Sequence, residues 1–297
     1  MSPPFATRST GRVFPPDNAA ELAEELARRW SLRLGRRFEG GVVGLVLEAA
    51  RADGTPVVLK VSAVDRETVH EGAALRHYDG AGAVRLLEAD TELGALLLER
   101  AEPGWPLISL PEEESNPIAA ALLRRLWKPP PAAHPFDLAA DRAAEWAETV
   151  PREWERLGRP CERRLVDRAA ALFRELGPTQ DEAVVLHTDF HGLNILAGRR
   201  EPWLAIDPKP LVGEPAYDAA GLVRDRRGAL AADPDLARRL RRRLDFLTAE
   251  LDLDRERLRG WSLALLVELG LWSLSVGDRT DAERELEIAR LLATETA

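Results

Sequence analysis

The sequence predicts an α/β (α+β) protein with a small β-rich lobe at residues 1–101 and a larger, mainly helical lobe at residues 102–297. Two observations predict this class. Residues 31–101 contain short apolar runs separated by turn residues, which is typical of strands. After "AEPGWP", whose prolines and glycine end the last of these runs, most apolar residues recur at helical spacing.

The N-terminal lobe is expected to contain five strands and two helices. The first helix is "DNAAELAEELARRW", with Asp17 or Asn18 as its N-cap. The expected strands are "SLRLGRRFEGG", "VGLVLEAA", "TPVVLKVSA", "AVRLLEAD" and "GALLLERA". The turn "ADGT" joins the second strand to the third. A second helix, "DRETVHEGAALRHYDG", capped by Asp65, is expected after the third strand.

The C-terminal lobe is expected to be helical with two short strands. Its first part, residues 115–177, is interrupted at "KPPPAAHP" and at Pro151. The two strands are expected at 183–187 and 203–207. Further helices are expected at roughly 215–229, 234–251, 255–276 and 279–295. The arginine run "RRLRRR" at 238–243 is predicted to be a solvated helix face.

Composition bounds the function. The net charge of −9 disfavours a nucleic-acid binder and suits a cationic substrate, because an acidic cleft concentrates cations. The single cysteine, Cys161, excludes an internal disulfide and fits a reducing compartment. The N-terminus has no apolar secretion signal, and no apolar run is long enough to span a bilayer. We therefore expect a cytoplasmic monomer that contacts neither nucleic acid nor membrane.

Polar residues follow both short strands of the C-terminal lobe. His187, Asp189 and Asn194 have the spacing H-x-D-x-x-x-x-N, and Asp207 directly follows the second strand. Magnesium prefers hard oxygen ligands, which Asn194 and Asp207 supply. Asp189 then remains to accept the proton of an attacking hydroxyl group. His187 is expected to brace the loop through hydrogen bonds.

The spacing is the catalytic-loop pattern of the protein-kinase-like fold, H-R-D-x-x-x-x-N, followed by a metal-binding aspartate. This fold requires a strand lysine and a helix glutamate upstream. Lys60, one of only three lysines, ends "VVLK", and Glu71 lies on the next predicted helix, with Glu67 as a second choice. The Lys60–Glu71 pair would hold the α- and β-phosphates of ATP. Gly40 and Gly41, in "GGVVG", could cover the phosphates.

The chain resembles the aminoglycoside phosphotransferases, and within them the streptomycin 6-kinase type (aminoglycoside/hydroxyurea antibiotic resistance kinases). The resemblance covers roughly residues 30–280. It depends on "TPVVLKV", "HEGAALRHYDGAGAVRLLEAD", "GALLLER", "LHTDFHGLNIL" and "WLAIDPKPLVGEPAYDAA". It implies ATP- and magnesium-dependent phosphorylation of a hydroxyl group on a streptomycin-like aminocyclitol, and hence antibiotic resistance.

The resemblance also assigns roles to residues. It implies that Asp189 is the catalytic base and that Asn194 and Asp207 bind magnesium. It implies that Lys60 binds phosphate. "LLLER" matches the hinge strand of the family, so backbone groups near Glu99 and Ala101 would bind adenine.

Departures from protein kinases indicate a small-molecule kinase without a switch. Thr188 stands where protein kinases carry an arginine that anchors a phosphorylated activation loop. Pro208 and Lys209 replace Phe-Gly after the metal-binding aspartate, so the phenylalanine flip cannot occur. Lys209 either pairs with acids locally or touches the transferred phosphoryl group.

Three further acids are candidate contacts for the guanidinium or ammonium groups of a cationic acceptor. Glu214 and Asp218 lie near the start of a predicted helix just after the metal loop, and Asp225 lies further along it. The helix dipole favours acids at that end in any case, so a structural role for Glu214 and Asp218 stays open.

Three other interpretations remain. A metabolite kinase of the same fold would phosphorylate a sugar or an amino alcohol, and an inactive nucleotide-binding module would phosphorylate nothing. A zinc site at His187, Asp189 and His191 would imply a metallohydrolase, although it leaves Lys60 and Asp207 without a role. The acceptor, the hydroxyl group that is phosphorylated, and the choice between ATP and GTP are not determined by the sequence.

Overall fold

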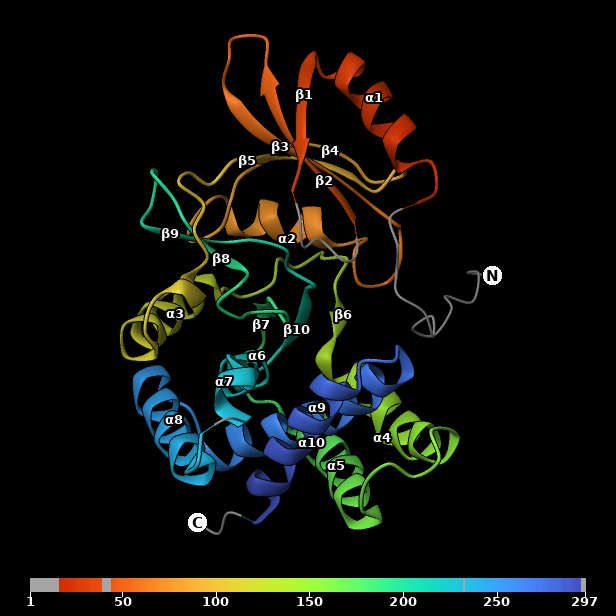
Figure 1. Cartoon of the computed structure of the whole chain (residues 1–297), viewed down its shortest axis with the longest axis vertical. Helices are drawn as coiled ribbons and strands as arrows, with labels where there is room; N and C mark the ends of the chain where they lie inside the picture. Colours follow the sequence, from red (N-terminus) through yellow and green to blue (C-terminus); the bar gives the residue numbers. More distant parts are fainter. Residues whose placement is uncertain (1–15, 39–43, 232, 295–297) are drawn as a thin grey trace. The chain divides into compact units, whose positions relative to one another are not determined.

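The computed structural model describes residues 16–38, 44–231 and 233–294 (Figure 1). These residues form two compact units. The first comprises the described residues up to Trp105 together with Leu196–Lys209, and the second comprises Pro106–Ile195 and the described residues from Pro210 onward. The expected division after residue 101 lies close to the end of the first segment, but a division into two continuous pieces leaves out the return of Leu196–Lys209.

The first unit contains a five-stranded antiparallel sheet with the strand order β1-β2-β3-β5-β4. Its strands are β1 (Leu32–Arg37), β2 (Gly44–Arg51), β3 (Pro56–Ser62), β4 (Leu86–Asp90) and β5 (Ala95–Glu99). Its helices are α1 (Ala19–Arg29), which precedes the sheet, and α2 (Glu71–Tyr78), which follows β3. The five predicted strands and the helix after the third are confirmed.

Of two predictions about local structure in this unit, one is confirmed and one is wrong. The turn between β2 and β3 forms as predicted, and Gly54 occupies it with a φ of +86° that other residues rarely adopt. The predicted cap at Asp65 is wrong, because the carboxylate of Asp65 accepts the backbone N–H groups of Glu67 and Thr68 in a separate turn. Helix α2 therefore begins only at Glu71.

Helix α1 and the sheet enclose an apolar core that fixes the direction of Lys60. The core cluster includes Ala19, Ala23, Leu26, Leu45, Val57, Leu59, Val61 and Leu97. Side chains alternate along a strand, so Lys60, between Leu59 and Val61, points to the opposite face. There it pairs in register with Leu96, whose side chain lies against Gly72 of α2. The alternation thus presents a lysine to the first turn of α2.

A hairpin from far along the chain completes the first unit. It consists of β8 (Ile195–Ala197) and β9 (Trp203–Ala205). Ala205 forms a parallel bridge with Ala83, just before β4. Figure 1 shows β9 in green beside the orange and yellow segments of this unit. Asp207 follows β9, so this attachment carries Asp207 into the unit that contains β3.

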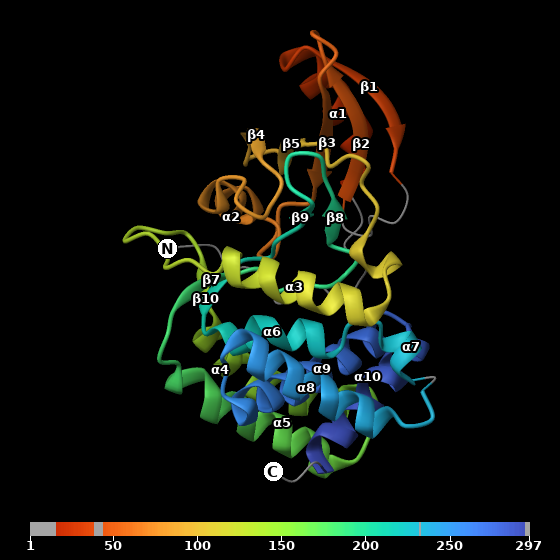
Figure 2. The ribbon, with the colours of Figure 1, turned by 90° about the vertical axis from the view of Figure 1, so that its left-hand side faces the viewer.

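The second unit is mainly helical (Figure 2). Its helices are α3 (Glu112–Leu126), α4 (Ala139–Arg156), α5 (Arg163–Leu176), α6 (Pro215–Val223), α7 (Arg227–Ala231), α8 (Leu236–Leu251), α9 (Arg255–Ser275) and α10 (Arg279–Thr294), with short 3-10 turns η1 (Leu107–Ser109) and η2 (Gly177–Thr179). Its sheet has the order β6-β10-β7, with β6 (Asp137–Leu138), β7 (Val184–Leu186) and β10 (Leu211–Gly213).

Helix α9 is the centre of this unit, because it is apolar around most of its circumference. Figure 2 shows α5 and α10 beside it. The fully buried Trp261 of α9 lies 6.3 Å from the ring of Phe173 in α5 and 5.0 Å from that of Tyr217 in α6, measured between ring centroids. These aromatic contacts fix the position of α6, which bears on the site described below.

Two predictions about helices are corrected. Pro151 lies inside α4, which continues to Arg156, so it does not interrupt the helix. The helix predicted at 215–229 is divided into α6 and α7, and Arg226 between them has a φ of +57°. In the described part of the chain, no helix combines the length and the apolar character that crossing a bilayer requires.

Candidate active site

Lys60 is the centre of a buried ion-pair cluster in the first unit. Its ammonium group donates to Oε2 of Glu71 at 2.7 Å and also contacts the carboxylate of Asp207. Burial alone would lower the pKa of Lys60, but the two carboxylates outweigh it and hold the pKa above its usual range. Lys60 is therefore a fixed positive charge, and Glu71 rather than Glu67 is its helix partner.

The segment that carries Asp207 is secured by Arg200, which lies in the β8–β9 turn. The guanidinium of Arg200 donates to both carboxylate oxygens of Glu99, at 2.8 and 2.9 Å. It also donates to the carbonyl oxygens of Gly80 at 2.6 Å and Ala83 at 2.8 Å. We call this set of bonds the Arg200 fork. It ties the hairpin to the end of β5 and to the segment before β4.

The hinge prediction concerns the backbone that follows β5. The N–H of Glu99 donates to the carbonyl of Arg85 at 2.8 Å, so this group already has a partner within the sheet. Downstream, Gly104 and Trp105 form backbone hydrogen bonds with Ala197 of β8. Adenine binding by the other backbone groups near Glu99 and Ala101 stays a prediction. Gly40 and Gly41 lie outside the described residues.

The loop after β7 has a strained conformation in the second unit. Thr188 has a φ of +56°, which is costly for a β-branched residue. The carboxylate of Asp218 accepts the backbone N–H groups of His187 at 2.9 Å and Thr188 at 2.7 Å. It also accepts the indole N–H of Trp127 at 3.1 Å. Asp218 thus stabilises this conformation from the first turn of α6.

Asp218 is fully enclosed, and burial raises its pKa while these hydrogen bonds oppose the rise. Both of its oxygens are occupied by groups of the protein. The structure therefore gives Asp218 a role in holding the loop, whereas contact with an acceptor stays a prediction.

Asp189 and Asn194 lie together in the same loop. The amide nitrogen of Asn194 donates to the backbone carbonyl of Asp189 at 2.9 Å and to its carboxylate at 3.3 Å. His191 lies 3.5 Å from the other carboxylate oxygen of Asp189. These contacts orient Asn194 so that its nitrogen is used within the loop and its oxygen remains an acceptor.

His187 is fully buried, and its ring packs edge-on against Phe190 at 5.4 Å between centroids. Ring packing thus holds His187, whereas the expected bracing of the loop through hydrogen bonds of its ring stays a prediction. Residues 16–38, 44–231 and 233–294 contain no group of three or more His, Cys, Asp or Glu side chains that could hold a metal ion, so no such cluster supports the zinc interpretation.

Glu214 and Asp225 also have partners within the second unit. Arg257 of α9 donates to both oxygens of Glu214, at 2.7 Å each, and the buried Trp261 donates to it as well. Asp225 accepts the backbone N–H of Gly192, in the loop after β7, at 3.0 Å. Contacts of either residue with an acceptor stay predictions.

Sequence reasoning missed the residues that hold these loops, above all Arg200 and Arg243. The partners of Arg200 lie 101 residues or more away in Glu99 and Gly80, and no local spacing links them. Arg243 belongs to the run expected to be solvated, yet it is buried. Sequence offered no usable signal, because arginine is the common basic residue throughout this chain.

The chain resembles known phosphotransferases in sequence and in fold. A hydroxyurea phosphotransferase of Kitasatospora aureofaciens is 39% identical over 289 residues, which is 96% of this chain and 81% of that protein. A streptomycin 6-kinase of Streptomyces glaucescens is 39% identical over 258 residues, which is 86% of this chain and 83% of that protein. The crystal structure of aminoglycoside phosphotransferase APH(4)-Ia matches with a TM-score of 0.67 at 18% identity, over 94% of this chain and all of that one.

The structural likeness confirms the protein-kinase-like fold. The family described as aminoglycoside/hydroxyurea antibiotic resistance kinase matches residues 29–277 of this chain. A match of that extent, together with relatives of 39% identity, also makes the chain a phosphotransferase that acts on a hydroxyl group. The chain belongs to the aminoglycoside/hydroxyurea antibiotic resistance kinases.

Proposed function

We propose that this kinase transfers the γ-phosphoryl group of ATP to a hydroxyl group of an aminoglycoside such as streptomycin. The observation that carries the proposal is the buried ammonium of Lys60, held by Glu71 and in contact with Asp207. A lysine fixed by a helix glutamate beside a metal-type aspartate is the arrangement that phosphoryl transfer in this fold requires.

Lys60 would bind the α- and β-phosphates of ATP. Its pKa is raised by the two neighbouring carboxylates, so it stays protonated throughout the physiological range. Glu71 is almost completely buried and holds the ammonium in place at 2.7 Å. A compact ammonium suits this role because it can turn its three donors toward several phosphate oxygens.

The donor set fits magnesium. Asp207 offers a carboxylate that is partly open to solvent, and Asn194 offers an amide oxygen whose nitrogen is already used on Asp189. Both are hard oxygen ligands, which magnesium prefers. When bound, the ion would neutralise charge on the phosphate oxygens.

Asp189 would orient the acceptor hydroxyl and accept its proton on a carboxylate oxygen. Asn194 and His191 lie at 3.3 and 3.5 Å from that carboxylate and fix its direction. The strained backbone at Thr188, secured by Asp218, presents Asp189 from a rigid loop. In this arrangement catalysis comes mainly from positioning.

A second acceptor has a specific observation in its favour. The relative that shares 39% identity over 96% of this chain is a hydroxyurea phosphotransferase. Hydroxyurea is small and uncharged, whereas streptomycin is large and cationic. The two acceptors therefore make different demands on acidic residues of the site, among which Glu214 and Asp225 are candidates.

The experiment is an ATP-consumption assay with streptomycin, hydroxyurea, choline and a simple sugar, with mass spectrometry of each product. We expect a phosphorylated aminoglycoside. Replacement of the base, Asp189→Asn, should lower kcat by about 10²–10⁴-fold and leave Mg-ATP affinity, measured by calorimetry, within about twofold. Turnover of hydroxyurea alone would move the proposal to the second acceptor. Turnover on none, with Mg-ATP still bound, would support an inactive nucleotide-binding module.

A further inference from the structure

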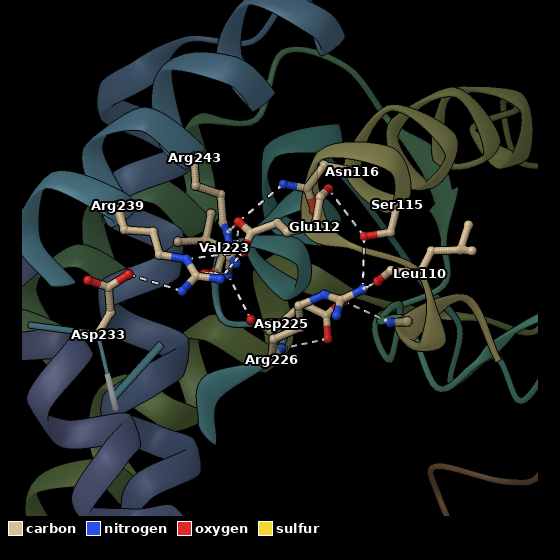
Figure 3. A network of polar contacts seen from close by, with 11 residues as sticks. Leu110, Glu112, Ser115, Asn116, Val223, Asp225, Arg226, Asp233, Arg239 and Arg243 are labelled. Atoms are coloured by element: carbon tan, nitrogen blue, oxygen red, sulfur yellow. Dashed lines mark hydrogen bonds and ion pairs between the residues drawn. The ribbon is translucent and has the colours of Figure 1, made fainter. Parts of the chain in front are cut away.

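Arg243 is a buried cation in the second unit (Figure 3). It lies in α8 and is 3% exposed. One nitrogen of its guanidinium donates to two backbone carbonyls at the end of α6, Val223 at 2.9 Å and Asp225 at 2.7 Å. The carboxylate of Glu112, at the start of α3, lies 2.6 Å away and neutralises the charge. Burying a charge is costly unless it is ion-paired and hydrogen-bonded. Arg243 meets both conditions, through Glu112 and through the two carbonyls.

The hydrogen bonds from Arg243 to these two carbonyls fix the backbone from which the carboxylate of Asp225 projects. Figure 3 shows Arg243 pointing toward the chain at Val223 and Asp225, with Glu112 on its other side. Arg226, the next residue, donates to the carbonyl of Leu110 at 2.6 Å. The segment at Asp225 is therefore held from both α8 and the chain before α3.

The carboxylate of Asp225 in turn holds the catalytic loop. Its Oδ2 accepts the backbone N–H of Gly192 at 3.0 Å, and the carbonyl of Gly192 accepts the N–H of Ile108 at 3.0 Å. A Cβ at Gly192 would lie 3.0 Å from Asp225 Oδ2 and 3.1 Å from Ile108 Cβ. The peptide is thus clamped on both sides, and a side chain at this position would displace its neighbours by a few tenths of an ångström.

Gly192 stands between Asp189 and Asn194, so its position decides theirs. The backbone of Asn194 also bonds within this loop, from its N–H to the carbonyl of His191 at 2.8 Å. A displacement of about 1 Å in a reacting group can lower a rate by about 100-fold.

We propose that Arg243 and Asp225 are positioning residues, which clamp the catalytic loop at Gly192 and thereby set Asp189 for phosphoryl transfer. The inference rests on the proposed function for its catalytic consequence. It differs from the sequence-based expectation that Asp225 contacts a cationic acceptor.

The experiment compares Asp225→Ala, Asp225→Asn and Arg243→Lys with Arg242→Lys, which changes an exposed neighbour in the same run. Each variant is first checked by thermal unfolding. Hydrogen exchange of the peptide that covers residues 187–195 then reports on the clamp without any substrate. Steady-state kinetics with streptomycin separates kcat from the KM of the acceptor.

We expect Asp225→Ala and Arg243→Lys to speed exchange in this peptide and to lower kcat by about 10–100-fold, with the acceptor KM changed less than about threefold. Asp225→Asn keeps an oxygen for the Gly192 N–H, so it should recover most of kcat. Arg242→Lys should behave as the unaltered protein does.

Two results would overturn the inference. One is unchanged exchange in Asp225→Ala. The other is a raised acceptor KM at unchanged kcat, equal in Asp225→Ala and Asp225→Asn, which would assign Asp225 to the acceptor. A protein that turns over no acceptor contradicts the proposed function instead, and the exchange measurement still decides whether the clamp exists.

Discussion

The two loops that carry the candidate catalytic groups are held by side chains of opposite charge. In the first unit, the cation Arg200 lies in the segment that leads to Asp207 and donates to the backbone carbonyls of Gly80 and Ala83. In the second unit, the anion Asp218 accepts hydrogen bonds from the backbone N–H groups of His187 and Thr188. In the first unit, the turn that leads to Asp207 itself supplies the arginine, which binds carbonyl groups of a distant segment. In the second unit, the loop supplies N–H groups, and a distant carboxylate accepts them.

This difference determines which substitutions each loop tolerates. Asparagine preserves one acceptor oxygen in place of aspartate, so the anionic anchor Asp218 can be partly replaced. Lysine has a single ammonium, which cannot reach two carbonyls and a carboxylate in different directions, so the cationic anchor Arg200 has no good substitute.

The largest effect is expected at the anionic anchor. Asp218→Ala leaves the N–H groups of His187, Thr188 and Trp127 without their acceptor, and we expect the free energy of unfolding to fall by about 3 kcal/mol. Asp218→Asn should lose about half as much. Urea unfolding measures both. Equal losses in the two variants would contradict the role of the acceptor oxygens.

A smaller effect is expected at the cationic anchor. Arg200→Met should lower the free energy of unfolding by about 2 kcal/mol, because the carboxylate of Glu99 and two carbonyls lose their donor. Arg200→Lys should recover little of this loss. A matched control is Arg156→Met, which breaks an exposed ion pair with Glu153 and should leave the free energy of unfolding almost unchanged. If Arg200→Lys kept the full free energy of unfolding, the several hydrogen bonds of the Arg200 fork would not be the source of the stabilisation.

The smallest effect depends on pH and concerns Glu99, the partner of Arg200. Burial would raise the pKa of Glu99, but the hydrogen bonds from Arg200 and from the Arg85 N–H outweigh it and hold the pKa below its ordinary value. The ionised carboxylate therefore stabilises the fold above its unfolded pKa, about 4.3, and this contribution disappears as the pH falls through the folded pKa.

Glu99→Gln should accordingly lower the free energy of unfolding at pH 7, and the loss should become smaller at each step below about pH 4. Urea unfolding of both proteins across this range gives the difference. The same series in an Arg200→Met background should depend less steeply on pH, since only the hydrogen bond from the Arg85 N–H then favours the ionised carboxylate. A constant difference at all pH values would contradict the ion pair as its source.

Most of the fold follows from patterns that are local in the sequence. Alternating apolar residues predicted the five strands of the first unit, and helical periodicity predicted α8, α9 and α10 closely. Pro151 was misjudged because α4 packs against neighbours that keep it helical through the proline. Tertiary contacts of this kind outweigh local propensity.

The candidate site, too, could be predicted from the sequence only in part. Lys60 and Glu71 could be paired from the sequence because the family motifs fix their order, and the structure brings them to 2.7 Å. The anchoring role of Asp225 could not be predicted, because it depends on where the chain turns after α6. The contact of Arg243 with Glu112 joins residues that are 131 positions apart. No spacing rule reaches that far in an arginine-rich chain.

The return of Leu196–Lys209 to the first unit has a consequence for biosynthesis. A ribosome that has completed Trp105 must add roughly a hundred residues more before Asp207 is available, which takes about 5 to 20 seconds at ordinary rates of translation. During that interval the nascent sheet contains Lys60 with only one of its two carboxylates. Vectorial synthesis therefore delays completion of the first unit until about half of the second unit has also been translated.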